Sequence, residues 1–118
     1  MRIYTSYFAR LSKIDVDKVP IAICAKVPTW YSGLNYKRLA PSYDILTELN
    51  DTQNEKTYKE RFYSEILSRL NRSEVFDDLE MLSRGKDVVL VGYENPSSPR
   101  HRHIAYEWLT GDNIMNEI

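Results

Sequence analysis

Residues 86–94 read KDVVLVGYE, a run of apolar residues flanked by charged side chains. A continuous apolar run of this length is typical of a strand buried on both faces, as in the parallel sheets of α/β proteins. Residues 19–26, VPIAICAK, form a second such run, and Pro20 lies near its start, where a missing N–H is tolerated. The two runs predict buried strands of a mostly parallel sheet.

The rest of the chain predicts helices and further strands around this sheet. Between residues 54 and 71, apolar side chains recur every four residues, the spacing of one helix face. Ser73 is expected to cap the next helix, which Gly85 ends. The other predicted elements are a strand at 2–9, a loop at 27–41, a helix at 42–50, a helix at 99–109 and a short strand at 113–118. This order predicts one α/β domain over residues 1–118, a three-layer sandwich.

The composition is that of an ordinary globular domain. Charged residues make up 28% of the 118 residues and the net charge is −1, which argues against a disordered chain. The apolar runs are shorter than the roughly 20 residues that span a bilayer, and the first residues lack a signal peptide's apolar core. We therefore expect a cytoplasmic protein without a membrane segment. Cys24, the single cysteine, is expected in the core.

Charge is distributed unevenly along the chain. Residues 1–40 are rich in lysine and arginine, whereas residues 41–95 are rich in aspartate and glutamate. This distribution permits a basic face on a nearly neutral protein, and basic faces attract anionic partners, but it does not require such a partner. Solvated surface charge without a partner is the simpler alternative.

Residues 97–103, SSPRHRH, mark the start of a helix that follows a buried strand. Ser98 is a suitable N-cap and Pro99 suits the first helical position, so Arg100 and His101 fall in the first turn. Backbone N–H groups at a helix start favour an anion, and strand-to-helix loops are where open α/β sheets bind ligands. The stretch therefore predicts an anion site.

The two histidines of this stretch point in different directions. At about 100° per residue, His101 faces the sheet, whereas His103 is expected at the surface, paired with Glu107. They are not expected to share a metal, and no metal site is predicted. His101 is the candidate general acid or base, with Glu94 to orient or activate it. A hydrogen-bonded core histidine is the alternative.

Several motifs that define enzyme classes are missing from the sequence. It contains no Walker loop, Rossmann glycine fingerprint, Gly-x-Ser-x-Gly elbow or His-Glu-x-x-His helix. Whether the protein is an enzyme therefore stays open, and no cofactor is expected. No oligomeric state is predicted either.

The run GKDVVLVGYENPSSPRHRHIAYEWL resembles the C-terminal signature of the family called domain of unknown function 488 (DUF488). The segments RIYTSYFARL, PIAICAKVPTWYSGLNYKRLAPSYDIL and KTYKERFYSEILSRL are similar to the short subgroup of that family, so the likeness covers nearly the whole chain. It implies a compact Rossmann-like α/β domain. It does not imply a particular activity.

The resemblance also marks positions at strand ends and in the loops that follow them. The matching positions are Tyr4, Thr5, Ser6, Lys26, Pro28, Tyr93, Glu94, His101 and Arg102. Gly92 and Arg100 stand where the family often has cysteines, so thiol or metal chemistry is not expected at these two positions. A binding role survives this loss more easily than a catalytic one.

Two functions are compatible with these residues. The first is binding of a phosphate-bearing ligand, a nucleotide or nucleic acid, at the carboxyl ends of the strands, with Lys26, Arg100 and Arg102 on the anion. The second is a binding module, either for nucleic acid through residues 30–38 or, as a protein–protein interaction module, for another protein. Residues 30–38 mix rings with charge as single-strand binders do, although the rings could simply pack the loop onto the sheet. The residues concerned are Trp30, Tyr31, Tyr36, Lys37 and Arg38.

Overall fold

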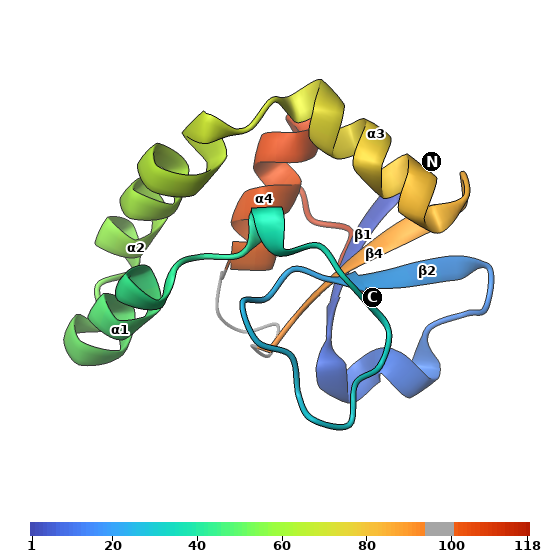
Figure 1. Ribbon diagram of the computed structural model, residues 1–118, viewed down its shortest axis with the longest axis horizontal. Helices are drawn as coiled ribbons and strands as arrows, with labels where there is room; N and C mark the ends of the chain where they lie inside the picture. The colour runs from blue at the N-terminus through green and yellow to red at the C-terminus, as the bar shows by residue number, and fades with distance from the viewer. Residues whose placement is uncertain (94–100) are drawn as a thin grey trace.

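The structure is a computed structural model that describes residues 1–93 and 101–118. Its centre is a sheet of four parallel strands in the order β1-β4-β2-β3. Figure 1 shows the first three of these strands, with β4 between β1 and β2. The strands are β1 (Ile3–Tyr7), β2 (Lys18–Ala22), β3 (Leu34–Asn35) and β4 (Asp87–Gly92). Leu90 of β4 stands opposite Thr5 on one side and Ile21 on the other. The prediction of a small α/β fold with a mostly parallel sheet is confirmed.

The position of β4 inside the sheet follows from its apolar side chains. Val88, Val89, Leu90 and Val91 are completely buried. Val88 and Leu90 belong to a hydrophobic cluster on one face, whereas Val89 and Val91 belong to a second cluster on the other face. Burying each such side chain contributes about 1.5–3 kcal/mol. β4 therefore joins the packing of both faces.

Helices cover one face of the sheet. α3 (Arg72–Ser83) packs against β4, and α4 (His101–Thr110) packs against β1 and β4. α1 (Tyr43–Thr52) and α2 (Glu55–Arg61) pack against each other, and Figure 1 shows them at the left, away from the sheet. Within residues 1–93 and 101–118, no helix combines the length and apolar character needed to cross a membrane.

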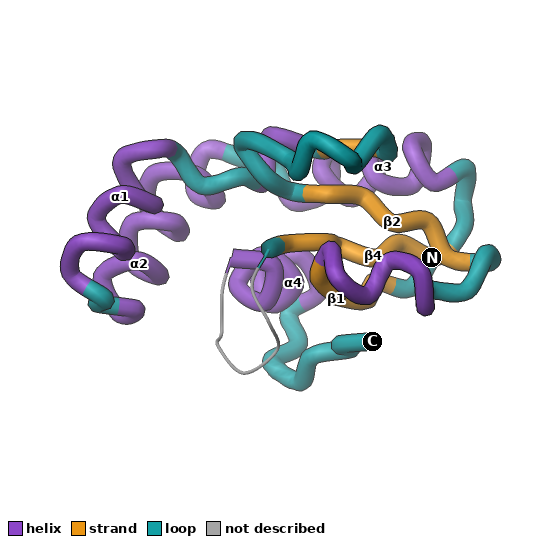
Figure 2. Tube along the Cα trace, turned by 90° about the horizontal axis from the view of Figure 1, so that it is seen from below, coloured by secondary structure: helices purple, strands orange, loops and turns teal. Residues whose placement is uncertain are grey.

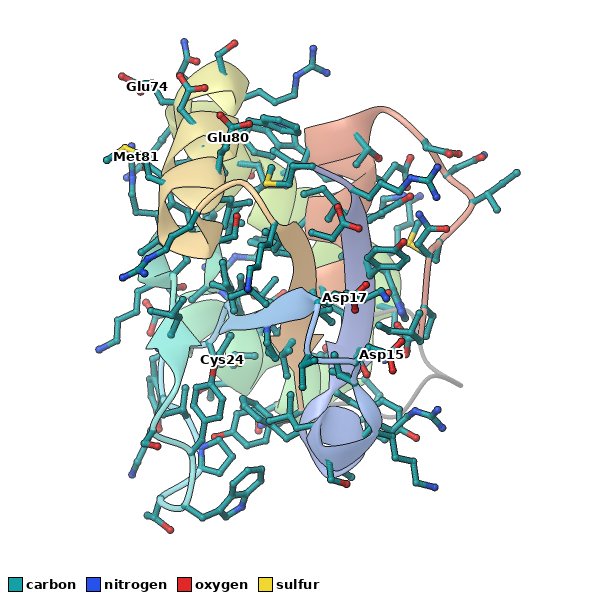
Figure 3. All side chains as sticks on the ribbon, turned by 90° about the vertical axis from the view of Figure 1, so that its right-hand side faces the viewer. Asp15, Asp17, Cys24, Glu74, Glu80 and Met81 are labelled. Carbon is teal, nitrogen blue, oxygen red and sulfur yellow. The ribbon has the colours of Figure 1, made fainter. Side chains whose placement is uncertain are left out.

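The opposite face is covered by a short 3-10 helix and a loop. η1 (Phe8–Lys13) contributes Phe8, and the loop after β2 contributes Cys24, to the second hydrophobic cluster. Cys24 is buried, as predicted, and Figure 3 shows it just past the end of β2. Its thiol lies 3.7 Å from the carbonyl oxygen of Val91. This cysteine therefore belongs to the core.

The helical stretch predicted at residues 54–71 is divided in the structure. α2 is followed by a π-helical turn, η3 (Phe62–Ile66), and by a 3-10 turn, η4 (Leu67–Arg69). Phe62 and Leu67 are buried, whereas Ile66, which the four-residue repeat places in the core, is only partly buried. A π-turn adds one residue to the helical repeat, so the buried face moves from Ile66 to Leu67.

The next helix begins before the predicted cap. Asn71 is the N-cap of α3, because its side-chain oxygen accepts the backbone N–H of Glu74 at 3.1 Å. The assignment of this role to Ser73, which lies inside the helix, was wrong. Gly85 follows the end of α3 with φ at +80° and fits the predicted stop. Figure 3 shows Glu74 and Met81 projecting from α3 away from the sheet.

Candidate functional site

The carboxyl ends of the strands meet at one edge of the sheet because the strands are parallel. β1 ends at Tyr7, β4 ends at Gly92, and α4 begins at His101. The guanidinium of Arg102 lies 5.9 Å from the centre of the Tyr7 ring. The structure therefore brings the first turn of α4 against the end of β1, at the kind of edge where α/β sheets bind ligands.

Thr5, Arg102 and His103 direct their side chains at one carboxylate, that of Glu117. Arg102 donates from Nη2 to Oε2 at 3.0 Å and from Nε to Oε1 at 3.3 Å. The Thr5 hydroxyl donates to Oε1 at 2.5 Å, and His103 Nε2 lies 3.1 Å from the same oxygen. We call the side chains of Thr5, Arg102 and His103 the cradle. Arg102 is 0% exposed, so its charge is compensated inside the protein.

The segment of residues 112–118 brings Glu117 to the cradle. The amide of Thr5 donates to the carbonyl of Asn116 at 2.9 Å, and the amide of Ile118 donates to the carbonyl of Thr5 at 2.8 Å. The segment thus lies along β1 on the side away from β4, as Figure 2 shows. Side chains alternate in extended chain, so Glu117 faces α4 and Ile118 joins the cluster on the other face.

A short strand was predicted at 113–118. In the structure this stretch forms one isolated bridge, between Thr5 and Glu117. Gly111, whose φ is +75°, makes the turn from α4 into the segment. A glycine adopts this left-handed conformation without the steric cost that a side chain would bring. The turn lets the chain double back beside β1.

The surroundings of Glu117 set its charge state. Burial raises the pKa of this carboxyl, but hydrogen bonds from His103, Arg102 and Thr5, together with the positive charge of Arg102, outweigh burial and lower the pKa to about 2. Glu117 is therefore an anion at neutral pH. The cradle holds a negative group in a mostly buried position.

His101 has a different partner, at the end of β2. Its Nε2 lies 2.7 Å from the backbone carbonyl oxygen of Ile23, and its ring packs edge-on against Phe62. The prediction that His101 faces the sheet is therefore confirmed. Because a carbonyl oxygen only accepts, Nε2 carries the hydrogen, and a general-base role for this nitrogen conflicts with the bond. This contact agrees with the alternative of a hydrogen-bonded core histidine.

His103 differs from its prediction. It is partly buried and contacts Glu117 instead of pairing with Glu107 at the surface. The reason is the folded-back segment, which helical spacing within α4 does not reveal. Within residues 1–93 and 101–118, no group of histidine, cysteine and acidic side chains is arranged to hold a metal.

Three aromatic rings surround Phe8 on the other side of the edge. Trp30, Tyr31 and Tyr93 have their ring centres 6.0, 5.2 and 4.9 Å from that of Phe8. Trp30 is 64% exposed and Tyr93 is 53% exposed, although both rings rest on a buried one. We call Trp30 and Tyr93, supported by Phe8, the aromatic shelf.

Hydrogen bonds fix the shelf to the loop after β2. The Tyr93 hydroxyl donates to the backbone carbonyl of Lys26 at 2.6 Å, and the Tyr31 hydroxyl donates to the carbonyl of Leu34 at 2.6 Å. Lys26 itself is exposed, and Pro28 is partly buried. The predicted residues Lys26, Trp30 and Tyr93 are therefore brought together.

The other predicted binding residues are distributed differently. Tyr4 packs against the second hydrophobic cluster, and the Ser6 hydroxyl lies 3.5 Å from the carbonyl of Ile118. Tyr36 is buried, and its hydroxyl donates to Asp78 at 2.5 Å, so its ring is not a surface for stacking. Glu94 and Arg100, and the predicted cap at Ser98 and Pro99, lie outside the described residues.

Tyr36 also connects the loop to α3 electrostatically. Burial and the hydrogen bond to Asp78 raise the pKa of the Tyr36 phenol to about 12. Arg38 forms an ion pair with the same carboxylate at 3.4 Å. The loop therefore follows the packing alternative at Tyr36, whereas Trp30 and Tyr93 present large exposed rings beside Phe8.

Glu117 is the residue of this site that the sequence did not reveal. A single glutamate in the segment NIMNEI carries no motif, and its importance comes from contacts with Arg102 and Thr5, the latter 112 residues earlier. The signal that could have pointed to Glu117 was the predicted strand at 113–118, because a strand there would pair with another strand of the sheet.

The fold and the site define a small parallel α/β domain with charged and aromatic groups at its carboxyl edge. The family described as the "Active DUF488-N3 subclade" matches residues 7–113, so the chain belongs to this family. The resemblance to DUF488 is thereby confirmed. The comparison with curated proteins gave no match, and neither did the comparison with solved structures.

Proposed function

We propose that the protein binds a phosphate-bearing ligand, a nucleotide or a nucleic-acid strand, at the carboxyl edge of its sheet. The observation that carries this proposal is the aromatic shelf, in which Trp30 and Tyr93 expose most of their surface while Phe8 holds them from behind. Contiguous exposed apolar surface on a folded domain commonly marks a binding site.

The chemistry of the shelf favours a nucleobase. Every base has a flat π-face, and stacking of a base on an aromatic side chain contributes about 1–3 kcal/mol. The rings are held in place by Phe8 and by the bond from Tyr93 to the Lys26 carbonyl, so little conformational freedom is lost when a base stacks on them.

Cations near the shelf suit the phosphate. Lys26 is exposed, and η1, which begins at Phe8, carries the exposed Arg10 and Lys13. Rossmann-like domains also bind their ligands at the carboxyl ends of parallel strands. Arg100 stays a predicted phosphate contact.

Binding is better supported than catalysis. His101 has its Nε2 engaged with the Ile23 carbonyl, and the proposed partnership between His101 and Glu94 stays a prediction. The family description calls the subclade active, which favours a functional site over a purely structural role. We therefore propose the ligand class and leave the reaction unassigned.

The test is binding of fluorescent oligonucleotides and of nucleoside phosphates to the wild type, Trp30→Ala and Tyr93→Ala. We expect each shelf variant to bind about tenfold more weakly, in line with the stacking contribution of one base, and the affinity to fall as salt rises. Tyr43→Ala is the matched control, because Tyr43 is a tyrosine that is 80% exposed on α1 and does not belong to the shelf.

Equal binding by the wild type and Trp30→Ala would overturn the role of the shelf. If neither nucleotides nor oligonucleotides bind the wild type, the proposal fails and the protein–protein interaction module becomes the better account. Oligonucleotide binding without nucleoside phosphate binding would identify the strand as the ligand.

A further inference from the structure

We infer that the cradle of Thr5, Arg102 and His103 is an exchangeable anion site, which Glu117 fills from within the chain until an external oxyanion displaces it. The segment of residues 112–118 would then act as an internal plug. This inference goes beyond the proposed function, because it concerns side chains other than the aromatic shelf. The two are linked by chemistry, since a phosphate group is an anion that the cradle can accept.

The donors of the cradle are those that proteins use to bind oxyanions. Arg102 presents Nε and Nη2 to the two oxygens of Glu117, a side-on arrangement of two nearly parallel N–H groups. A phosphate monoester offers two oxygens of similar spacing to the same fork. The Thr5 hydroxyl and the His103 ring add two further donors to one of these oxygens. Glu117 therefore occupies the place of a ligand's anionic group.

The segment that carries Glu117 is attached more lightly than a strand of the sheet. Its described backbone pairing with β1 is a single bridge, in which the Thr5 amide donates to the Asn116 carbonyl and the Ile118 amide donates to the Thr5 carbonyl. Within the segment, Ile114 is 75% exposed and contributes little to the core. Opening the segment breaks these bonds, the bond from the Asn116 side chain to the Ile3 carbonyl and the bonds of the cradle to Glu117. An oxyanion in the cradle replaces the last of these, and the strands of the sheet stay paired, so release of the segment costs less than unfolding the sheet.

Space for a ligand lies directly beside the cradle. A cavity of about 500 Å³ is lined by His103 of the cradle, by Asn113 and Met115 of the segment, and by Lys56 and Lys59 of α2. Release of the segment would remove Asn113 and Met115 from the wall of this cavity and Glu117 from Arg102. The two lysines place further positive charge near an incoming anion, although Glu55 and Glu107 also line the cavity.

The experiment compares phosphate binding by the wild type, Glu117→Gln and Glu107→Gln, with inorganic phosphate as the probe and calorimetry as the readout. Glutamine keeps the size of Glu117 but removes the charge that competes with phosphate. We expect Glu117→Gln to bind phosphate at least tenfold more tightly than the wild type, and its melting temperature to rise with phosphate. Glu107→Gln removes a charge from the same cavity without touching the cradle, so it should resemble the wild type.

A second measurement on the unmodified chain covers the case in which Glu117→Gln fails to fold. Hydrogen exchange is followed at the amides of Thr5 and Ile118, whose hydrogen bonds join β1 to the segment. High phosphate should speed exchange at these two amides, because displacement of Glu117 opens the bridge. Slower or unchanged exchange would overturn the plug.

The outcomes also separate this inference from the proposed function. Equal phosphate affinity in the wild type and Glu117→Gln, or an equal gain in Glu107→Gln, would overturn the plug, and nucleotide binding on the shelf would stand. Phosphate binding to Glu117→Gln, without nucleotide binding to any variant, would support the plug and remove the proposed function.

Discussion

Arg102 Nη2 lies 3.0 Å from Glu117 Oε2, and this ion pair joins the first turn of α4 to the segment beside β1. The Arg102 side chain is 0% exposed, whereas the Glu117 side chain is 21% exposed. Taking a guanidinium out of water is costly unless a partner compensates its charge. The burial of Arg102 therefore depends on the segment of residues 112–118, because this segment supplies the carboxylate that compensates the guanidinium charge.

Replacing Arg102 by methionine should destabilise the protein. Arg102→Met keeps much of the buried volume but leaves the Glu117 carboxylate without its guanidinium, and removing one partner of a buried pair costs about 3–5 kcal/mol. Urea unfolding followed by circular dichroism measures the loss. Arg69→Met, at an exposed position on η4, is the control and should change stability by less than about 0.5 kcal/mol. A similar loss in both variants would contradict the role given to the pair.

The stability of the wild type should fall in acid partly because of Glu117. The pKa of this group is about 2 in the folded protein and 4.5 in the reference state, so folding favours its ionised form. The contribution is complete above the unfolded pKa and is lost as the pH falls from about 5 toward 2. Glu117→Gln has no such proton to bind, so its stability should change less over this range.

The pH profile is measured as the urea midpoint at a series of pH values. Glu74→Gln is the comparison, because Glu74 is an exposed glutamate at the start of α3 and does not belong to the cradle. This control should keep the acid slope of the wild type. An unchanged slope in Glu117→Gln would show that other carboxyls cause the acid loss.

Removing the His101 side chain should lower the free energy of unfolding of the protein. His101→Ala leaves the Ile23 carbonyl without its donor and opens a cavity beside Phe62, a combined loss of about 2–4 kcal/mol. Thermal unfolding measures it. In His101→Gln the amide can still donate to Ile23, so part of the loss should be recovered. If alanine costs nothing, His101 is not a structural residue, and its catalytic candidacy gains support.

The parts of the fold that the sequence predicted well are those decided by local chemistry. Residues 86–94 and 19–26 are apolar at successive positions, and only a strand with two buried faces satisfies such a run. The left-handed glycines at 85 and 111 mark the ends of α3 and α4. The π-turn at Phe62–Ile66 could not be predicted from the sequence. Ile66, four residues after Phe62, is as apolar as Leu67, the residue that the core buries.

The site was harder to predict because its groups come from distant segments. The predicted direction of His101 followed from helical phase alone, and it is correct. The environment of His103 and Arg102 depends on Glu117, which reaches them only because the chain turns at Gly111 and pairs with β1. Likewise, Tyr93 joins Trp30 through Phe8, three residues from three separate segments. No spacing rule links residues across such turns.

The strand order also has a consequence for how the chain folds. β1 and β2 follow each other in sequence but never pair, because β4 lies between them. A ribosome must therefore release residues 87–92 before β1 can pair with β4, and before β2, which also pairs with the short strand β3, can fill its other edge. Pairings so distant in sequence form slowly. The nascent chain thus joins β1 to the rest of the sheet late, when β4 emerges and fills the gap between β1 and β2.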